Sequence, residues 1–312
     1  MDEIYQQLKK YGKVRLNEPM SKHTTFKIGG PARYFVFIDN TSKLVELLQY
    51  LDGEGVDHFI IGGGSNTLVN EDGYEGVVIK MKDSEIKIEG DMVQASSGAS
   101  TAEVAQKSFA AGLTGFEWGV GIPGTIGGAA RGNAGCMGGE VKDYLEKVEV
   151  YRDGEVIELD CPGCEFSYRT SIFKNNNDII LKVWLKLEKG DGKEVMKKAL
   201  QNLNYRRDTQ PQGFASSGCI FKNPKSSELG SYSSELPEEL KGKEIIPAGW
   251  LIEKAGMKGE KVGGAEVSER HGNFIVNIGD ATGSDVLTLI EKVKEAVYNK
   301  FKVNLEEEVK IL

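Results

Sequence analysis

Residues 119–128 of this 312-residue chain read GVGIPGTIGG, and this stretch does most to decide the fold. From Gly119 it contains the spacing G-x-G-x-x-G, which many dinucleotide-binding folds share. A doubly wound fold places that spacing between a parallel strand and a long helix. Here residues 116–118 make a poor strand and Pro123 interrupts the pattern. No GK[ST] follows, so a P-loop is excluded as well. What remains is a backbone cradle for a pyrophosphate, with Pro123 expected at the first position of a short helix.

Two further glycine-rich loops lie on either side of this stretch in the sequence. They are residues 62–66 (GGGSN), directly after an expected strand, and residues 133–139 (NAGCMGG). Successive glycines let backbone N–H groups converge on an anion, and Ser65 and Asn66 add side-chain donors. Taken alone, the first loop also fits a tight turn between strands, and the last fits a flexible connector. Three such loops within residues 62–139 are better explained by one long dinucleotide ligand.

Hydrophobic periodicity and turn residues predict a mixed order of helices and strands. Hairpin turns are expected at Gly90-Asp91 and Asp153-Gly154, helix N-caps at Ser100 (with Glu103 in a capping box) and Ser284, and loops over 115–139 and 225–243. This order favours an α+β architecture with antiparallel pairing over a doubly wound parallel sheet. Strands are expected over residues 34–38, 58–61, 76–80, 85–89, 92–95, 148–152, 155–159, 179–187 and 303–312, and helices over residues 1–15, 42–51, 100–111, 193–207, 248–255 and 285–301.

Composition and charge restrict the classes of function. The chain carries 39 basic and 47 acidic residues, a net charge of −8, which argues against broad binding to nucleic acid or anionic membranes. The N-terminal residues are polar, so no signal peptide is expected, and the cytoplasm is the expected location. The four cysteines fit that compartment as free thiols. Cys161 and Cys164 form a C-P-G-C pair, but no second CxxC or paired histidine completes a zinc site, so no metal is expected.

Eight strings along the chain resemble the UDP-N-acetylenolpyruvoylglucosamine reductases (MurB), in that family's order and over nearly the whole length. Jointly they are specific, although no single string is, and the length resembles the shorter form of the enzyme. The strings are IGGGSN (61–66), GIPGTIGGA (121–129), NAG (133–135), FSYRTS (166–171), GCIFKNP (218–224), AGWLIEKAG (248–256), HGNFIVN (271–277) and LEEEV (305–309).

The resemblance implies a two-subdomain FAD-binding fold of the vanillyl-alcohol-oxidase type, followed by an α+β substrate domain. The expected boundaries are 1–82 and 83–192 for the FAD subdomains and 193–302 for the substrate domain, with the strand 303–312 returning to the FAD region. It also implies that NADPH reduces non-covalently bound FAD. The flavin then reduces UDP-N-acetyl-3-O-(1-carboxyvinyl)glucosamine to UDP-N-acetylmuramate, a peptidoglycan precursor. The UDP-sugar and NADPH are the expected partners, and no obligate protein partner is expected.

Three residues match the family's catalytic positions, and each has an ordinary structural alternative. Arg169 matches the arginine that faces the substrate carboxylate, although it also fits a surface arginine. Cys219 matches a proton donor that is often serine, although most free cysteines are small buried hydrophobes. Glu308 matches the last acid of L-E-x-E-V, although residues 306–308 also fit a solvated charge run. Strand alternation over 303–312 would turn Glu308 away from the apolar face, but it leaves Glu307 on that face without explanation.

The resemblance also assigns binding residues. The cofactor-binding residues are Gly62, Gly63, Gly64, Ser65, Asn66, Gly98, Pro123, Gly124, Thr125, Gly127, Gly128, Asn133 and Ala134, and the substrate-binding residues are Tyr168, Arg206, Lys222 and Asn223.

Two rival functions use the same glycine loops. The first is a flavin oxidase of a small alcohol or sugar. Such enzymes often tether the flavin through a histidine, and no histidine lies between His58 and His271. The second is a non-catalytic nucleotide-binding regulator, which does not account for Arg169, Cys219 and Glu308 matching together.

Overall fold

The computed structural model describes residues 3–312, and the chain divides into two compact units. Unit 1 consists of Met1–Glu18, Ala32–Gly63 and Tyr74–Asp208, and unit 2 of Pro19–Pro31, Gly64–Gly73 and Thr209–Leu312. Unit 1 itself contains two lobes with separate hydrophobic cores. The mixed helix and strand content confirms the α+β class, while the expected boundaries after residues 82 and 192 stay predictions.

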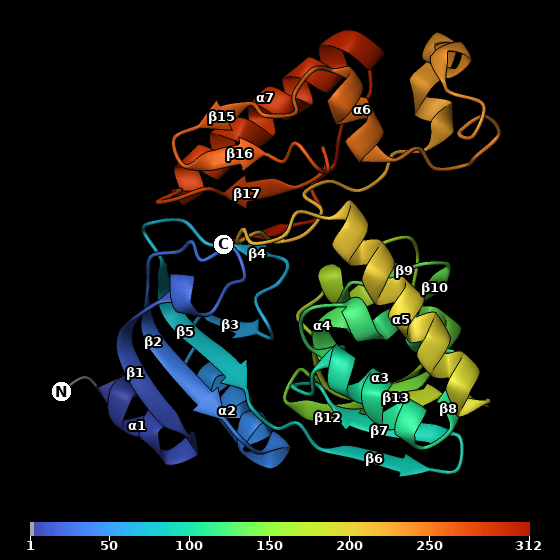
Figure 1. Ribbon diagram of the computed structural model, residues 1–312. Coiled ribbons are helices and arrows are strands. Elements are labelled where there is room, and N and C mark those ends of the chain that lie inside the picture. The colour runs from blue at the N-terminus through green and yellow to red at the C-terminus, as the bar shows by residue number, and fades with distance from the viewer. Residues whose placement is uncertain (1–2) are drawn as a thin grey trace. The chain divides into compact units, whose positions relative to one another are not determined.

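The first lobe of unit 1 is a four-stranded sheet in the order β1-β2-β5-β3, with apolar faces of two helices packed on it (Figure 1). Both β2 and β3 pair with β5 in parallel, so the expectation of antiparallel pairing is wrong for this lobe. A helical crossover between β2 and β3 makes that parallel arrangement possible. Residues 13–19 are a strand and not a continuation of the first helix. The elements are α1 (Glu3–Tyr11), β1 (Lys13–Pro19), β2 (Pro31–Ile38), α2 (Thr41–Gly53), β3 (His58–Ile61) and β5 (Tyr74–Met81).

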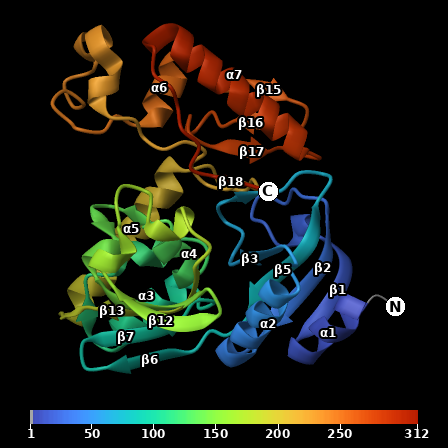
Figure 2. The ribbon, with the colours of Figure 1, turned by 180° about the vertical axis from the view of Figure 1, so that it is seen from behind.

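The second lobe is a five-stranded antiparallel sheet in the order β12-β11-β13-β7-β6 (Figures 1 and 2). Both predicted hairpins are confirmed, because β6 pairs with β7 and β11 with β12. Helices α3 and α4 pack on this sheet. Its elements are β6 (Ile86–Glu89), β7 (Met92–Ser96), α3 (Thr101–Ala110), β8 (Leu113–Thr114), η2 (Glu117–Gly121), α4 (Ile126–Arg131), β9 (Gly135–Cys136), β10 (Gly139–Glu140), η3 (Val141–Asp143), β11 (Leu145–Arg152), β12 (Glu155–Asp160), η4 (Pro162–Cys164), η5 (Ile172–Lys174), β13 (Ile179–Lys186), β14 (Glu188–Lys189) and α5 (Gly192–Thr209).

Two details at the helix starts of this lobe differ from expectation. Ser100 does cap α3, but its side chain makes no capping hydrogen bond, and Glu103 pairs instead with Lys107 at 3.0 Å. Helix α4 begins at Ile126 with Thr125 as its N-cap, so Pro123 precedes the helix and does not start it. Thr125 is the N-cap because its hydroxyl can accept a backbone N–H at the helix start, whereas proline has no side-chain acceptor.

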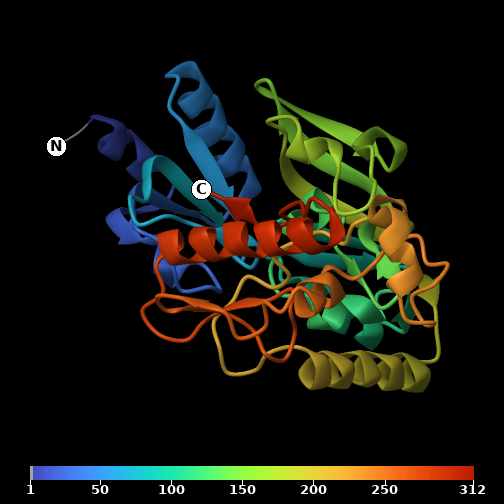
Figure 3. The same cartoon turned by 90° about the horizontal axis from the view of Figure 1, so that it is seen from above.

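In unit 2, three antiparallel strands in the order β15-β16-β17 pack against α6 and α7, and Figure 3 shows α7 as one long helix. The elements are η1 (Met20–Lys22), β4 (Thr67–Leu68), η6 (Ser226–Glu235), α6 (Ala248–Lys254), β15 (Lys261–Val262), β16 (Ala265–Val267), β17 (Ile275–Asn277), α7 (Gly283–Phe301) and β18 (Lys310–Ile311).

Three expectations for this unit are wrong. The region 225–243, expected as a loop, contains the 3-10 helix η6. The N-cap of α7 is Thr282, which forms a capping box with Asp285, whereas Ser284 hydrogen-bonds to Glu71. The long C-terminal strand shrinks to β18, which pairs in parallel with β4.

Cys136, Cys161, Cys164 and Cys219 are all free thiols in the structure. None of the helices within residues 3–312 combines the length and the apolar character that a membrane crossing requires.

Candidate active site

Two of the glycine-rich loops meet in unit 1. A Cβ atom on Gly63 would lie 2.6 Å from the Cα of Gly124, and one on Gly62 would lie 2.5 Å from Oγ1 of Thr125. Neither distance leaves room for a side chain, so the close approach of Gly63 to the Gly124 backbone and of Gly62 to the Thr125 side chain requires glycine at both positions. The loops predicted from sequence to share one ligand are therefore in direct contact.

A third segment, residues 97–101, packs on these two loops. Together, residues 62–63, 97–101 and 124–128 form what we call the glycine cradle. Ile126 and Gly127 donate their backbone N–H groups to the carbonyls of Ala99 and Ser97, at 2.9 and 3.0 Å. A Cβ on Gly127 would come within 2.6 Å of Ser97, whereas Gly128 is exposed and meets only Thr125, at 3.5 Å. The cradle thus offers an open glycine surface beside packed backbone. Such a surface fits the close approach of a dinucleotide pyrophosphate.

The remaining residues of the first loop lie in unit 2. Gly64 has φ +64, and a Cβ there would lie 2.0 Å from the carbonyl oxygen of His23. The side-chain amide of Asn66 donates to the carbonyl of Glu308 at 2.9 Å, so in this structure it holds the C-terminal segment. Its assignment to the cofactor stays a prediction.

Gly98 of unit 1, also assigned to the cofactor, needs to be glycine because a Cβ would lie 2.5 Å from the Asp83 carbonyl oxygen.

Arg169 lies in the second lobe of unit 1 with a strained backbone, at φ +55. Its guanidinium donates to the carbonyl of Gly135 at 2.7 Å and lies 5.4 Å from the centre of the Tyr168 ring. The ammonium of Lys174 in turn donates to the Arg169 carbonyl at 2.7 Å. A non-glycine residue held in the left-handed region costs of order 1 kcal/mol or more, and such strain is concentrated at functional sites. Arg169 shares this conformation with eight other non-glycine residues, among them Asp153 in a hairpin turn and Lys302 at a helix end, so its functional role stays a prediction.

Asn133 connects the third glycine loop to the Arg169 segment. It is fully buried, with φ +43. Its amide nitrogen donates to Glu140 at 2.8 Å and to the carbonyl of Ser167 at 3.0 Å, and its amide oxygen accepts the N–H of Lys142 at 3.0 Å. The side chain is thus occupied with positioning the loop. Its neighbour Ala134 is tied by backbone hydrogen bonds alone.

Arg169, a predicted catalytic residue, and Arg206, a predicted substrate-binding residue, both lie near the Cys136 thiol. Burial raises the pKa of the Cys136 thiol, and the charges of Arg206 and Arg169 oppose that rise. Arg206 also packs on the second glycine loop, since a Cβ on Gly121 would lie 2.6 Å from its Cδ. The tertiary fold therefore places two guanidinium groups near the turn between β9 and β10.

In unit 2, Cys219 and Glu308 lie on two segments that pair side by side. Glu308 donates its backbone N–H to the carbonyl of Ile220, the residue after Cys219, at 2.8 Å. Lys222 donates its backbone N–H to the Glu306 carbonyl, also at 2.8 Å. This pairing places two predicted catalytic residues, far apart in sequence, within one residue of each other in register.

The three consecutive glutamates have different surroundings. Glu306 forms an ion pair with Lys222, and Glu307 forms one with Lys294 of α7 at 2.9 Å. The Glu307 side chain therefore does not lie on the apolar face of a strand. Residues 306–308 do not form a regular strand, and Lys294 of α7 neutralises the Glu307 carboxylate. Glu308 is fixed through its backbone by Asn66 and Ile220.

A single buried side chain clamps the Cys219 segment. Asn273, only 2% exposed, accepts the N–H of Phe221 at 2.9 Å and donates to the Phe221 carbonyl at 2.8 Å. Its own carbonyl accepts the N–H of Ile220 at 2.9 Å. Phe221 pairs with Glu307 on one side, and Asn273 satisfies its backbone N–H and carbonyl on the other. The string HGNFIVN marked this position, but its partner lies 52 residues away and could not be read from the sequence.

Lys222 and Asn223, assigned to the substrate phosphates, both have protein partners. The Lys222 ammonium, 20% exposed, pairs with Glu306, which is 70% exposed. The side-chain oxygen of Asn223 accepts the N–H of Ala248 at 2.9 Å and so caps α6. Their contacts with substrate stay predictions.

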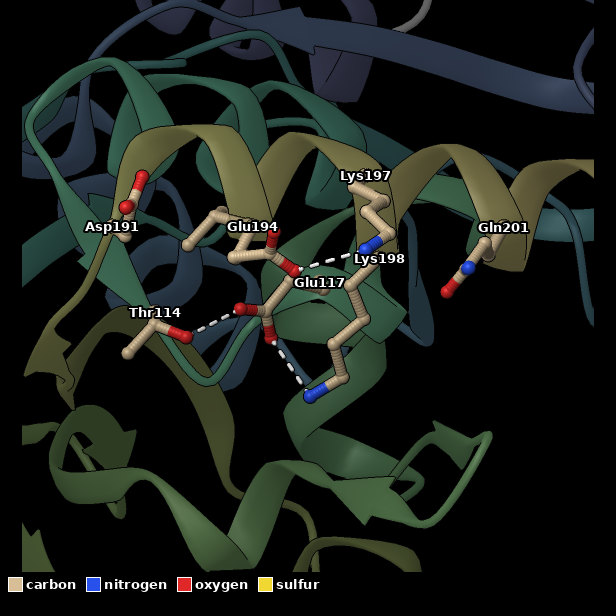
Figure 4. Close-up of a pocket in the computed structure, with 8 residues that line it drawn as sticks. Thr114, Glu117, Asp191, Glu194, Lys197, Lys198 and Gln201 are labelled. Atoms are coloured by element: carbon tan, nitrogen blue, oxygen red, sulfur yellow. Dashed lines mark hydrogen bonds and ion pairs between the residues drawn. The ribbon is translucent and has the colours of Figure 1, made fainter.

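A cavity of about 320 Å³ in unit 1 involves none of these residues. Its main feature is Glu117, 1% exposed, whose carboxylate lies between the Thr114 hydroxyl and the Lys198 ammonium (Figure 4). Burial raises the pKa of Glu117, but hydrogen bonds from Thr114 and the Gly115 N–H, with the Lys198 charge, hold it below its usual value. The cavity has mixed charge and lies beside η2, the element that leads into the second glycine loop. Glu117, the first residue of η2, therefore supports that loop.

Comparison with known proteins agrees with this arrangement. Residues 32–160 match the family model described as an FAD binding domain. Residues 210–312 match that of the C-terminal domain of UDP-N-acetylenolpyruvoylglucosamine reductase. The reductase of that name from Caldanaerobacter subterraneus is 43% identical over 97% of this chain and 95% of its own, and that from Bacillus subtilis 37% over 100% and 99%.

The crystal structure of the reductase from Thermus caldophilus superposes with a TM-score of 0.76 at 30% identity, covering 96% of this chain and 98% of its own. Identity and coverage at these levels reach across both units. The chain therefore belongs to the UDP-N-acetylenolpyruvoylglucosamine reductase family.

Proposed function

We propose that this protein is an FAD-dependent reductase that uses NADPH to convert UDP-N-acetyl-3-O-(1-carboxyvinyl)glucosamine to UDP-N-acetylmuramate. The observation that carries the proposal is family membership over the whole chain, with the glycine cradle in unit 1 suited to a dinucleotide. The same membership favours the reductase over a flavin oxidase of a small alcohol or sugar. The product makes the protein part of peptidoglycan synthesis, and hence of cell shape and division. A UDP-sugar and NADPH as substrates favour the cytoplasm.

FAD, when bound, would supply the hydride, taken from NADPH, that reduces C3 of the enolpyruvyl group. The residues that would hold it are the glycines and Thr125 of the cradle. Its binding there is non-covalent in the proposal, because no histidine is available in the loops. The protein's task is then to make an electron-rich enol ether accept electrons, which requires a fixed positive charge and a proton donor.

Arg169 supplies the positive charge. Its guanidinium faces the substrate carboxylate and stabilises the electron density that flows onto that group as C3 is reduced. The hydrogen bond to Gly135 supports this role, because it holds the guanidinium before substrate arrives. A pre-organised charge needs no rearrangement in the transition state.

Cys219 supplies the proton. Its Sγ–H donates to C2 after C3 has been reduced, and the thiolate regains a proton from solvent, so one NADPH and one proton are consumed per product. Glu308, whose backbone pairs with Ile220, takes part in catalysis as the family match implies. Lys222 and Asn223 bind the phosphates of the UDP-sugar, as the family match implies. Arg206 is a further candidate for that task, and Tyr168 is a proposed substrate-binding residue.

Spectroscopy of the purified protein tests the proposal. A flavin absorbance should bleach on adding NADPH without oxygen and return on adding the enolpyruvyl UDP-sugar, with UDP-N-acetylmuramate as product. NADH in place of NADPH serves as the comparison for the electron donor. A protein that carries no flavin, or whose reduced flavin is not reoxidised by this substrate, contradicts the proposal.

A further inference from the structure

Arg131, the last residue of α4, is the one arginine among residues 3–312 whose side chain has no described partner. Each of the other seven arginines of the chain contacts a carboxylate, a carbonyl, an aromatic ring or a thiol, or has another polar interaction. Arg131 is nevertheless only partly exposed. Its backbone carbonyl is fixed by the Ser171 hydroxyl at 2.6 Å, so the position of the residue is well defined.

This arrangement is costly unless an anion compensates it. Burial lowers the pKa of the Arg131 guanidinium, and no carboxylate opposes that effect. A guanidinium remains charged in proteins, so partial removal from water without a counter-charge destabilises the fold. Proteins normally pair such groups, and Arg15, Arg33, Arg152 and Arg207 each have a carboxylate partner here. The counter-charge of Arg131 is therefore expected from outside the chain.

The position of Arg131 indicates which anion. Helix α4 starts in the glycine cradle at Thr125, and Arg131 lies three residues after the exposed Gly128, hence on the same side of the helix. Six helical residues span about 9 Å, within reach of a long arginine side chain from the cradle. We propose that Arg131 is the counter-ion for an anionic part of bound FAD, either its pyrophosphate or its reduced ring. This inference rests on the proposed function and adds a residue that the sequence did not single out.

Titration of flavin-free full-length protein with FAD tests the inference. Arg131→Gln and Arg131→Met should bind FAD about 10- to 100-fold more weakly than the wild type, the range of a lost charge-assisted hydrogen bond. Arg131→Lys, which keeps the charge, should fall between them and the wild type. Arg33→Gln is the matched control. It removes an arginine of the same unit that lies 3.9 Å from Glu75 and is half exposed, and FAD binding should be unchanged.

Stability without cofactor separates this role from a structural one. If Arg131 is unpaired until FAD binds, Arg131→Met should leave the midpoint of thermal unfolding of the flavin-free protein unchanged or raise it. With FAD present, the same variant should unfold at a lower temperature than the wild type. A fall in the flavin-free midpoint of several degrees would mean that Arg131 supports the fold, and would overturn the inference.

The flavin midpoint potential then identifies the part of FAD involved. A charge beside the ring favours the reduced form, so Arg131→Gln should make the potential more negative. A charge at the pyrophosphate should leave it unchanged. Both results support the inference, provided that FAD affinity falls. Unchanged FAD affinity overturns it, including the case in which only the KM for the UDP-sugar rises. Absence of FAD binding by the wild type would instead contradict the proposed function.

Discussion

The glycine cradle of unit 1 and the paired segments of unit 2 are built in opposite ways. In the cradle, formed by residues 62–63, 97–101 and 124–128, backbone hydrogen bonds join the segments, and Gly62, Gly63 and Gly127 have no room for a side chain. In the paired segments, residues 219–223 and 306–308 present side chains, and partners such as Asn273 and Lys294 fix their positions. A backbone site should tolerate no added methyl group. A side-chain site should tolerate a chemically equivalent replacement and fail with an inert one.

The side-chain part of this comparison predicts the largest effect at Cys219. Cys219→Ala should slow reoxidation of the flavin by the UDP-sugar by about 10²- to 10⁴-fold, the usual contribution of a general acid, while reduction by NADPH is unchanged. Cys219→Ser should keep substantial activity, because a hydroxyl also donates a proton. Rapid mixing measures both half-reactions, and Cys161→Ser is the control. A fully active alanine variant would remove Cys219 from the mechanism.

Arg169→Ala should lower kcat by at least ~100-fold, the size of a lost transition-state donor, with little change in flavin reduction by NADPH. The reason is that its charge acts on the substrate carboxylate and not on electron entry. Stopped-flow traces of the two half-reactions provide the measurement, with Arg33→Ala as the control. Equal loss in both half-reactions would show that Arg169 instead holds the flavin or the fold.

The backbone part of the comparison predicts a steric effect at Gly63. Gly63→Ala places a methyl group 2.6 Å from the Cα of Gly124, so the loops must separate, and FAD binding should weaken by ~10- to 100-fold. Gly53→Ala, at the end of α2 with no atom within 4 Å, is the matched control. It should be neutral or stabilise by up to ~1 kcal/mol. Fluorescence titration with FAD separates the two, and equal affinities would refute the cradle.

The substitution Asn273→Asp tests whether the paired segments of unit 2 depend on side chains held in fixed positions. The carboxylate still accepts from the Phe221 N–H, but it cannot donate to the Phe221 carbonyl and should repel it. The free energy of unfolding should fall by ~1–3 kcal/mol. Since Asn273 acts through the Cys219 segment, kcat should fall while the KM for NADPH stays constant. Asn304→Asp, at an exposed position, should change neither quantity. Lower stability with unchanged kcat would limit Asn273 to the fold.

The smallest expected effect is at Glu117, whose contribution to the free energy of unfolding should depend on pH. Its folded pKa lies below the ordinary value of 4.5, so its contribution to stability is complete above that value and is lost as pH falls through the folded pKa. Glu117→Gln should lower the free energy of unfolding by ~1–2 kcal/mol at neutral pH, and the difference from wild type should shrink below that value. Urea unfolding between pH 3 and 7, with Glu103→Gln as control, measures it. A constant difference would contradict the role.

The local elements could largely be predicted because their causes are local. Turn residues at Gly90 and Asp153 fixed both hairpins, and apolar periodicity located α2 and α7. Where a cap depended on geometry, prediction failed: Thr282 and not Ser284 caps α7, because Ser284 is engaged by Glu71, more than 200 residues earlier. The parallel pairing in the first lobe was missed for a similar reason, since it follows from how α2 packs.

The sequence by itself determined the family, the glycine loops and the residue types at the reacting positions. These features are short motifs whose chemical properties depend on the residues themselves and not on tertiary packing. Only the tertiary structure decided that Gly63 touches Gly124, that Glu307 is neutralised by Lys294, and that Asn273 clamps Phe221. Within residues 3–312, it alone left the Arg131 side chain without a described partner. Contacts between distant residues depend on packing of the whole chain. An unpaired charge is recognised only when every neighbour is in place.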